Sequence, residues 1–179
     1  PNLKVWVEYA NEVWGGFGSE IHAIDQGLAL GFDQGDFPRY DWFGDEEYAR
    51  FRYYAYRSLQ IHEIFENQFG AGSDRIVNVF SGWFGQPGLS KVHRDALSDP
   101  EINPNDRSID VYALAPYFNL SSTGSDDEIL LDAMERIDTV NVPRSQAHFE
   151  VWSELGVPLV IYEGGQHMTS GGEAINRKP

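Results

Sequence analysis

Two glutamates follow hydrophobic, strand-like segments at opposite ends of the chain. Glu12 lies within VWVEYANEVW (5–14), and Glu163 ends the run PLVIYEGG (158–165). A carboxylate that follows a buried strand is costly unless it has a partner or a task. Acetal hydrolysis needs two carboxyl groups around one bond, one to protonate the leaving oxygen and one to attack, or to activate water, at the anomeric carbon. The two glutamates therefore predict a glycosidic site.

Further side chains suited to sugar binding also follow strand-like segments. Aromatic rings offer flat platforms for sugar rings, and amide, hydroxyl and imidazole groups can bond to sugar hydroxyls. The candidate substrate-binding residues are Asn11, Trp14, Trp83, Gln86, Tyr117 and His167. Five of the candidate residues have an alternative structural role. Glu12 and Glu163 could be surface or capping carboxylates, and Tyr117, Trp14 and Trp83 could be core residues. Glu8 is interpreted as a paired interior carboxylate.

Short apolar strands that alternate with helices must position these residues. The strands are expected at 3–10, 75–82, 108–118 and 158–165, and the helices at 45–70, 89–97, from Ser125 to about Ile137, and 145–156. This alternation predicts right-handed βαβ units and a parallel sheet, with chemistry at the carboxyl ends of the strands. Segment 15–44 is expected to be a long loop with some helix above the first strand end.

Composition limits the classes of partner. The 179 residues carry a formal net charge of −15, which disfavours nucleic acid and anionic membrane surfaces. There is no cysteine, so disulfides and thiolate chemistry are excluded. No apolar run reaches the roughly 20 residues of a membrane span. The expected partner is a carbohydrate substrate, with no nucleic acid, no membrane insertion and no cofactor.

The strings EYANE and VIYEGG resemble the clan A glycoside hydrolases, which are (β/α)8 barrels. The longer string VEYANEVW is similar to a subgroup of large bacterial carbohydrate-active proteins with a related Glu-Tyr-Ser-Asn-Glu-Val-Trp signature. The resemblance implies that Glu12 is the acid/base at the end of barrel strand four, and Glu163 the nucleophile at the end of strand seven. It also implies that Asn11 binds the sugar 2-hydroxyl and that Tyr117 orients Glu163.

The resemblance covers strands four to seven only. We therefore expect residues 1–179 to be a partial catalytic barrel domain within the α/β class, a segment of a TIM barrel. The remainder of the barrel, strands one to three and eight, would come from the same or a longer chain. Polysaccharide is usually met outside the cell, so the expected location is extracellular.

Two alternatives stay open at this stage. The first is a non-catalytic barrel that binds carbohydrate or has a structural role in an extracellular assembly. The second is a flavodoxin-like or other open α/β domain. Strand order separates the second from a barrel, because a barrel segment keeps strands in sequential order whereas a doubly wound sheet reverses direction.

Overall fold

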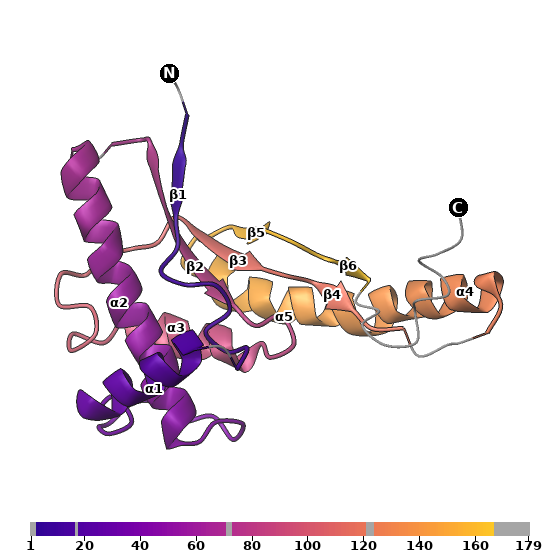
Figure 1. Cartoon of the computed structure of the whole chain (residues 1–179), viewed down its shortest axis with the longest axis horizontal. Coiled ribbons are helices and arrows are strands. Elements are labelled where there is room, and N and C mark those ends of the chain that lie inside the picture. Colours follow the sequence, from indigo (N-terminus) through magenta and orange to yellow (C-terminus); the bar gives the residue numbers. More distant parts are fainter. Residues whose placement is uncertain (1–2, 17, 71–72, 121–123, 167–179) are drawn as a thin grey trace.

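The four main strands form one parallel sheet in their order along the chain (Figure 1). The computed structural model describes residues 3–16, 18–70, 73–120 and 124–166. The strands are β1 (Val5–Val7), β2 (Ile76–Gly82), β3 (Val111–Leu114) and β5 (Leu159–Ile161), with order β1-β2-β3-β5. The expected α/β class with a parallel sheet is therefore confirmed.

The strands are shorter than the sequence predicted. Segment 108–118 gives β3 and then a separate β4 (Tyr117–Phe118), which pairs with β6 (Gly165–Gln166) in a small parallel ladder. Pro116 lies between β3 and β4, and its missing N–H and fixed φ interrupt the ladder. β1 ends at Val7, before Glu8, so residues 8–12 form a connection and not a strand end.

The long central helix was predicted almost to the residue. α2 (Asp45–Phe69) begins with three acidic residues, and the Glu47 side chain accepts a 3.0 Å hydrogen bond from the Gly44 N–H. α3 (Gly88–Leu97) also lies where it was expected. The segment 15–44 contains α1 (Gly18–Ala29), which packs closely on α2 because Gly27 lacks a side chain: a Cβ there would lie 2.1 Å from the Ala49 carbonyl oxygen.

The last helical region is a single continuous rod. α4 (Asp126–Arg136) runs through a π-helical segment, η1 (Ile137–Asn141), into α5 (Val142–Ser153). The predicted capping box is present, since the Ser125 side chain accepts from the Glu128 N–H and Glu128 bonds back to the Ser125 N–H. The wider turns of η1 precede Pro143, which has no N–H to continue an α-helical ladder. None of the α4 residues is buried, and α4 extends away from the sheet (Figure 1).

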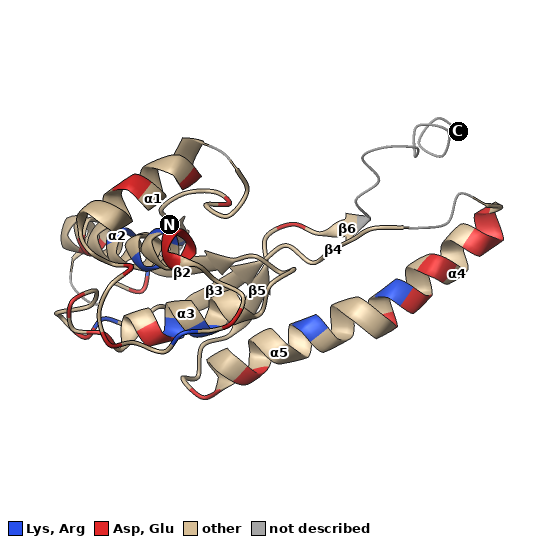
Figure 2. Cartoon of the chain, turned by 90° about the horizontal axis from the view of Figure 1, so that it is seen from below, with Lys and Arg blue, Asp and Glu red and all other residues tan. Residues whose placement is uncertain are grey.

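The two faces of the sheet have different neighbours. On one face Phe80, Tyr112 and Leu114 join side chains of α2, α3 and α5 in the main core. Figure 2 shows α3 and α5 beneath the sheet on this side. Val77, Val79, Val111, Ala113 and Val160 form a second cluster whose described members all come from strands. Alternate residues of a strand point to opposite faces, so this second cluster lies on the face away from the helices.

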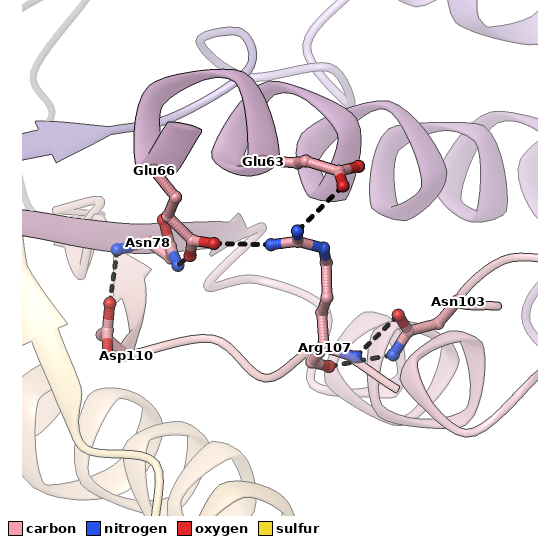
Figure 3. A network of polar contacts seen from close by, with 6 residues as sticks. All are labelled: Glu63, Glu66, Asn78, Asn103, Arg107 and Asp110. Atoms are coloured by element: carbon pink, nitrogen blue, oxygen red, sulfur yellow. Dashed lines mark hydrogen bonds and ion pairs between the residues drawn. The ribbon is translucent and has the colours of Figure 1, made fainter. Parts of the chain in front are cut away.

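A polar network ties α2 to the segment that leads into β3 (Figure 3). Arg107 donates to Glu66 at 2.6 Å and forms an ion pair with Glu63 at 3.1 Å. Glu66 accepts from the Asn78 side chain, and the Asn78 N–H donates to Asp110. Burial opposes ionisation of Glu66, but the bonds from Asn78 and Arg107 outweigh it and lower the pKa of Glu66. Asn78 lies in the first half of β2 and Asp110 immediately precedes β3, so the network is nearer the amino ends of these two strands.

Within the described ranges, none of the helices combines the length and the apolar character that crossing a membrane requires.

Candidate active site

Glu12 lies in a tight turn that follows the first strand. Its φ of 46° is in the left-handed region, and its carbonyl accepts a 2.8 Å hydrogen bond from the Gly15 N–H. Residues with a Cβ seldom adopt this conformation, which costs roughly 1–2 kcal/mol. The next residue, Val13, is fully buried and anchors the turn in the main core. Glu12 is therefore held at a fixed position by a backbone conformation that is unfavourable for glutamate, and its side chain is half-buried.

Glu163 lies in the turn between β5 and β6, two residues after β5 ends. The pairing of Tyr117 with Gly165 brings β4 alongside this turn. The Glu163 carboxylate accepts a hydrogen bond from the Tyr117 hydroxyl, and this bond is the main reason why the pKa of Tyr117 is raised. The turn continues through Gly165, whose φ of 124° suits glycine alone. The Glu163 side chain is exposed.

The structure brings Glu12 and Glu163 to the same group of tyrosines. Both charges act on Tyr117, where they add to the effect of its hydrogen bond to Glu163 in raising the pKa of Tyr117. Both also act on Tyr162, whose pKa is raised first by burial and then by Glu12, Glu8 and Glu163. Glu163 directly follows Tyr162 in the chain and bonds to Tyr117, so both glutamates lie near the same two tyrosines.

Glu8 lies beneath this region in a buried chain of hydrogen bonds. The Ser81 hydroxyl donates to the Glu8 carboxylate. The hydroxyl of Tyr54, on α2, donates in turn to the Ser81 hydroxyl oxygen. Burial raises the pKa of Glu8, the Ser81 bond opposes the rise, and repulsion from Glu12 adds to it. The interpretation of Glu8 as a paired interior carboxylate agrees with these contacts.

A pocket of about 660 Å³ opens beside Glu12. Its volume is in the range of small-ligand sites, and aromatic rings form much of its wall. The side chains and glycines that line it are Glu12, Trp14, Gly15, Gly82, Trp83, Phe84, Gly85, Ala115, Tyr117, Asn119, Arg144 and Tyr162. Trp83 is 48% exposed, so a large part of its side chain is accessible to a ligand. Gly85 leaves room for this ring, since a Cβ there would lie 2.8 Å from Nε1 of Trp83.

Not all of the predicted binding residues reach this pocket. Glu12, Trp14, Trp83 and Tyr117 line it, whereas Glu163 is not part of the lining and adjoins it through Tyr117 and Tyr162. Asn11 is exposed and is not part of the lining. Gln86 lines a different pocket of about 650 Å³, together with Trp42 and Lys91. His167 lies outside the described residues.

Three lining residues with polar side chains were missed by the sequence analysis: Asn119, Arg144 and Tyr162. Tyr162 carries a signal, since it immediately precedes Glu163 at the end of a strand. Arg144 carries none, because its position depends on how the α4–α5 rod is turned against the sheet. Asn119 follows β4, a strand that was predicted only as the end of a longer one.

The buried histidines belong to the core. Burial lowers the pKa of His62 to about 4, of His93 to about 3 and of His148 to about 4. His62 bonds to the Val7 carbonyl, and His148 bonds to Ser90 and to the Phe84 carbonyl. In the part of the chain that the structure describes, no cluster of three or more His, Asp or Glu side chains is arranged to hold a metal ion.

The fold and the pocket together define an α/β protein with two carboxylates at the carboxyl ends of a parallel sheet. No family model matches the chain, and neither a curated protein nor a solved structure matches it.

Proposed function

We propose that the protein is a retaining glycoside hydrolase that cleaves an oligosaccharide or polysaccharide. The observation that carries the proposal is that Glu12 and Glu163, 151 positions apart in the sequence, act on the same two tyrosines at the edge of one pocket. Glycoside cleavage requires two carboxyl groups that flank the bond, and the aromatic side chains of the pocket are suited to holding a sugar ring.

In the proposed mechanism Glu163 attacks the anomeric carbon and forms a glycosyl-enzyme. Glu12 first donates a proton to the leaving oxygen and then removes one from the attacking water. The Tyr117 hydroxyl holds the Glu163 carboxylate by their hydrogen bond and stabilises its charge. Trp83 and Trp14 offer faces on which sugar rings stack. Retention corresponds to carboxyl groups about 5–5.5 Å apart.

We further propose that the sheet is strands four to seven of a TIM barrel. Sequential strand order supports a barrel, since a doubly wound sheet reverses direction at its switch point. The strand-only cluster around Val79 and Val111 corresponds to a barrel interior, where side chains of the strands pack in layers. Trp6, in register with Val77 on this face, is 55% exposed and would be covered by further strands of a longer chain.

The decisive experiment measures hydrolysis by the full-length protein and its variants with two leaving groups. Glu163→Gln removes the nucleophile, so we expect at least a 10³-fold loss of kcat/KM with both an alkyl and a dinitrophenyl glycoside. Glu12→Gln removes the proton donor, so the loss should be large with the alkyl glycoside and much smaller with the dinitrophenyl glycoside, whose departure needs no proton. NMR of the first product should show the retained anomer.

Glu101→Gln is the matched control, because Glu101 is an exposed glutamate outside the pocket. It should leave both rates unchanged. Full activity in Glu163→Gln would show that Glu163 is not the nucleophile. An inverted anomer as the first product would show that the reaction is a single displacement and not a double displacement.

The position of Asn11 favours a second candidate function, a barrel that binds carbohydrate without cleaving it. Asn11 is exposed outside the pocket, whereas a hydrolase of the resembled clan uses this residue on the sugar. Calorimetry that shows sugar binding by the full-length protein, with no product after prolonged incubation, would support this candidate over the hydrolase.

A further inference from the structure

Arg144 brings a positive charge into the pocket beside Glu12. It is the third residue of α5, and among the described lining residues it alone is a lysine or an arginine. Its side chain is half-buried. Burial is the largest cause of the lowered pKa of the neighbouring His148, and the hydrogen bond to the Phe84 carbonyl partly opposes it. Arg144 lowers this pKa further by charge repulsion. The pocket therefore has a cationic side in addition to its carboxylate side.

The guanidinium of Arg144 has no partner among the described residues. Every other arginine that the structure describes makes an ion pair or a hydrogen bond; these are Arg39, Arg50, Arg52, Arg57, Arg75, Arg94, Arg107 and Arg136. Arg144 makes neither, although a partly desolvated guanidinium has five N–H donors to satisfy. In a chain with a net charge of −15 carboxylates are abundant, so a half-buried arginine without one is a notable exception.

The acidic groups of the site do not neutralise Arg144. Glu12 lines the same pocket, yet no described carboxylate lies within 4.0 Å of the Arg144 nitrogens. The pocket wall also includes Trp83, Phe84 and Asn119, which carry no charge. A ligand that reaches both sides would thus place a cleavable bond at Glu12 and an anionic group at Arg144.

We propose, on the basis of the proposed function, that the substrate is an acidic polysaccharide and that Arg144 binds the carboxylate of a hexuronate residue. A carboxylate is planar and matches the two parallel N–H donors of a guanidinium, and the stacked sugar ring fits the exposed face of Trp83. The negative net charge does not oppose this binding strongly, because charges farther than about 8 Å are screened at physiological ionic strength. Arg144 is then the specificity determinant of the site.

The test compares acidic oligosaccharides with their own methyl esters. The probes are oligogalacturonides and oligoglucuronides, each in free-acid and fully methyl-esterified form, so that only the charge differs. Binding is measured by calorimetry with the full-length protein carrying Glu12→Gln, which prevents turnover. We expect at least one acid to bind about 10- to 100-fold more tightly than its ester, with the preference falling as salt is raised.

Arg144→Gln should bring the ratio of acid to ester affinity to about 1. Arg144→Lys should retain part of the preference, because lysine keeps the positive charge but lacks the two parallel N–H donors of the guanidinium. Arg136→Gln is the matched control: Arg136 belongs to the same rod, pairs with Asp132 outside the pocket, and should leave the ratio unchanged. Retention of the ratio in Arg144→Gln, or equal binding of acid and ester by the parent, overturns the inference.

Failure of this inference can be told from failure of the proposed function. If the parent protein cleaves neutral oligosaccharides, Glu163→Gln does not, and acids bind no more tightly than their esters, the hydrolase is supported and the acidic substrate is rejected. If acids bind through Arg144 but no glycoside is hydrolysed, the acidic ligand stands and the hydrolase is rejected. If neither binding nor cleavage is found, both are rejected.

Discussion

At the scale of single residues, the most unusual feature is the left-handed backbone conformation of Glu12. Glycine or asparagine would take a φ of 46° at little cost, yet the position holds a glutamate. Residues kept in sparsely populated conformations cluster at functional sites, where the surrounding structure determines them. The strained backbone at Glu12 therefore agrees with the proposed acid/base role of this residue.

This strain predicts that Glu12→Gly is more stable than the parent. We expect the free energy of unfolding to rise by about 1 kcal/mol, because glycine has no Cβ to clash in the left-handed region. Hydrolysis of alkyl glycosides should be lost in the same variant. Chemical denaturation measures the first effect and product formation the second. Glu12→Gln separates charge from backbone, since it removes the repulsion with Glu8 but keeps the Cβ. Equal stability of the Gly and Gln variants would contradict the strain argument.

The sequence could predict the residues whose position depends on a strand end. Glu12, Trp83 and Tyr117 were predicted because a short apolar run fixes where its following residues emerge. Gln86 lies three residues further along, where a turn carries the chain to another pocket. Arg144 was beyond prediction, because helical periodicity gives a residue's face on its own helix but not the angle of that helix to the sheet.

At the scale of elements, helices were easier to predict than strands. α2 and α4 begin with local signals, acidic first turns and a capping box, that operate whatever the rest of the fold does. Strand lengths depend on a partner strand, so the apolar run 108–118 gave no sign of where its ladder stops apart from Pro116. The π-helical segment η1 merges two predicted helices into one rod, whereas a proline such as Pro143 more commonly marks the end of one helix or the start of the next.

The capping box of α4 predicts a local effect of Ser125→Ala. Loss of the cap should destabilise the first turn by about 1 kcal/mol. Because no α4 residue is buried, the effect should be confined to this helix. Amide hydrogen exchange should therefore quicken in the first turns of α4 while the denaturation midpoint of the whole protein stays constant. Ser145→Ala, at an exposed serine of α5, is the control. A drop in the global midpoint would show that α4 is coupled to the core more tightly than its exposure indicates.

At the scale of the whole molecule, three buried histidines link folding to pH. In the folded protein the pKa values of His62 and His148 are about 4 and that of His93 about 3, whereas in the unfolded chain they are about 6.5. Between these values the unfolded chain binds more protons than the folded protein, so stability rises with pH. The contribution of these histidines is complete above about pH 6.5 and is lost as the pH falls toward 4.

We therefore expect the free energy of unfolding to fall steeply on acidification from pH 7 to pH 5, with a slope that approaches about 1.4 kcal/mol per pH unit for each histidine. Denaturant titrations at several pH values measure the slope. His148→Gln should lower it by about one third of the histidine contribution, whereas His22→Gln, at an exposed histidine, should leave it unchanged. A flat profile between pH 7 and pH 5 would contradict the buried, neutral state of these side chains.

The network of Arg107, Glu66 and Asn78 (Figure 3) shares no residue with the lining of the pocket that contains Glu12 and Arg144. Substitutions around Arg107 should therefore change how much of the protein is folded and leave ligand binding at the pocket unchanged. Substitutions at Arg144 should do the reverse. Stability and binding preference could accordingly diverge independently among relatives of this chain.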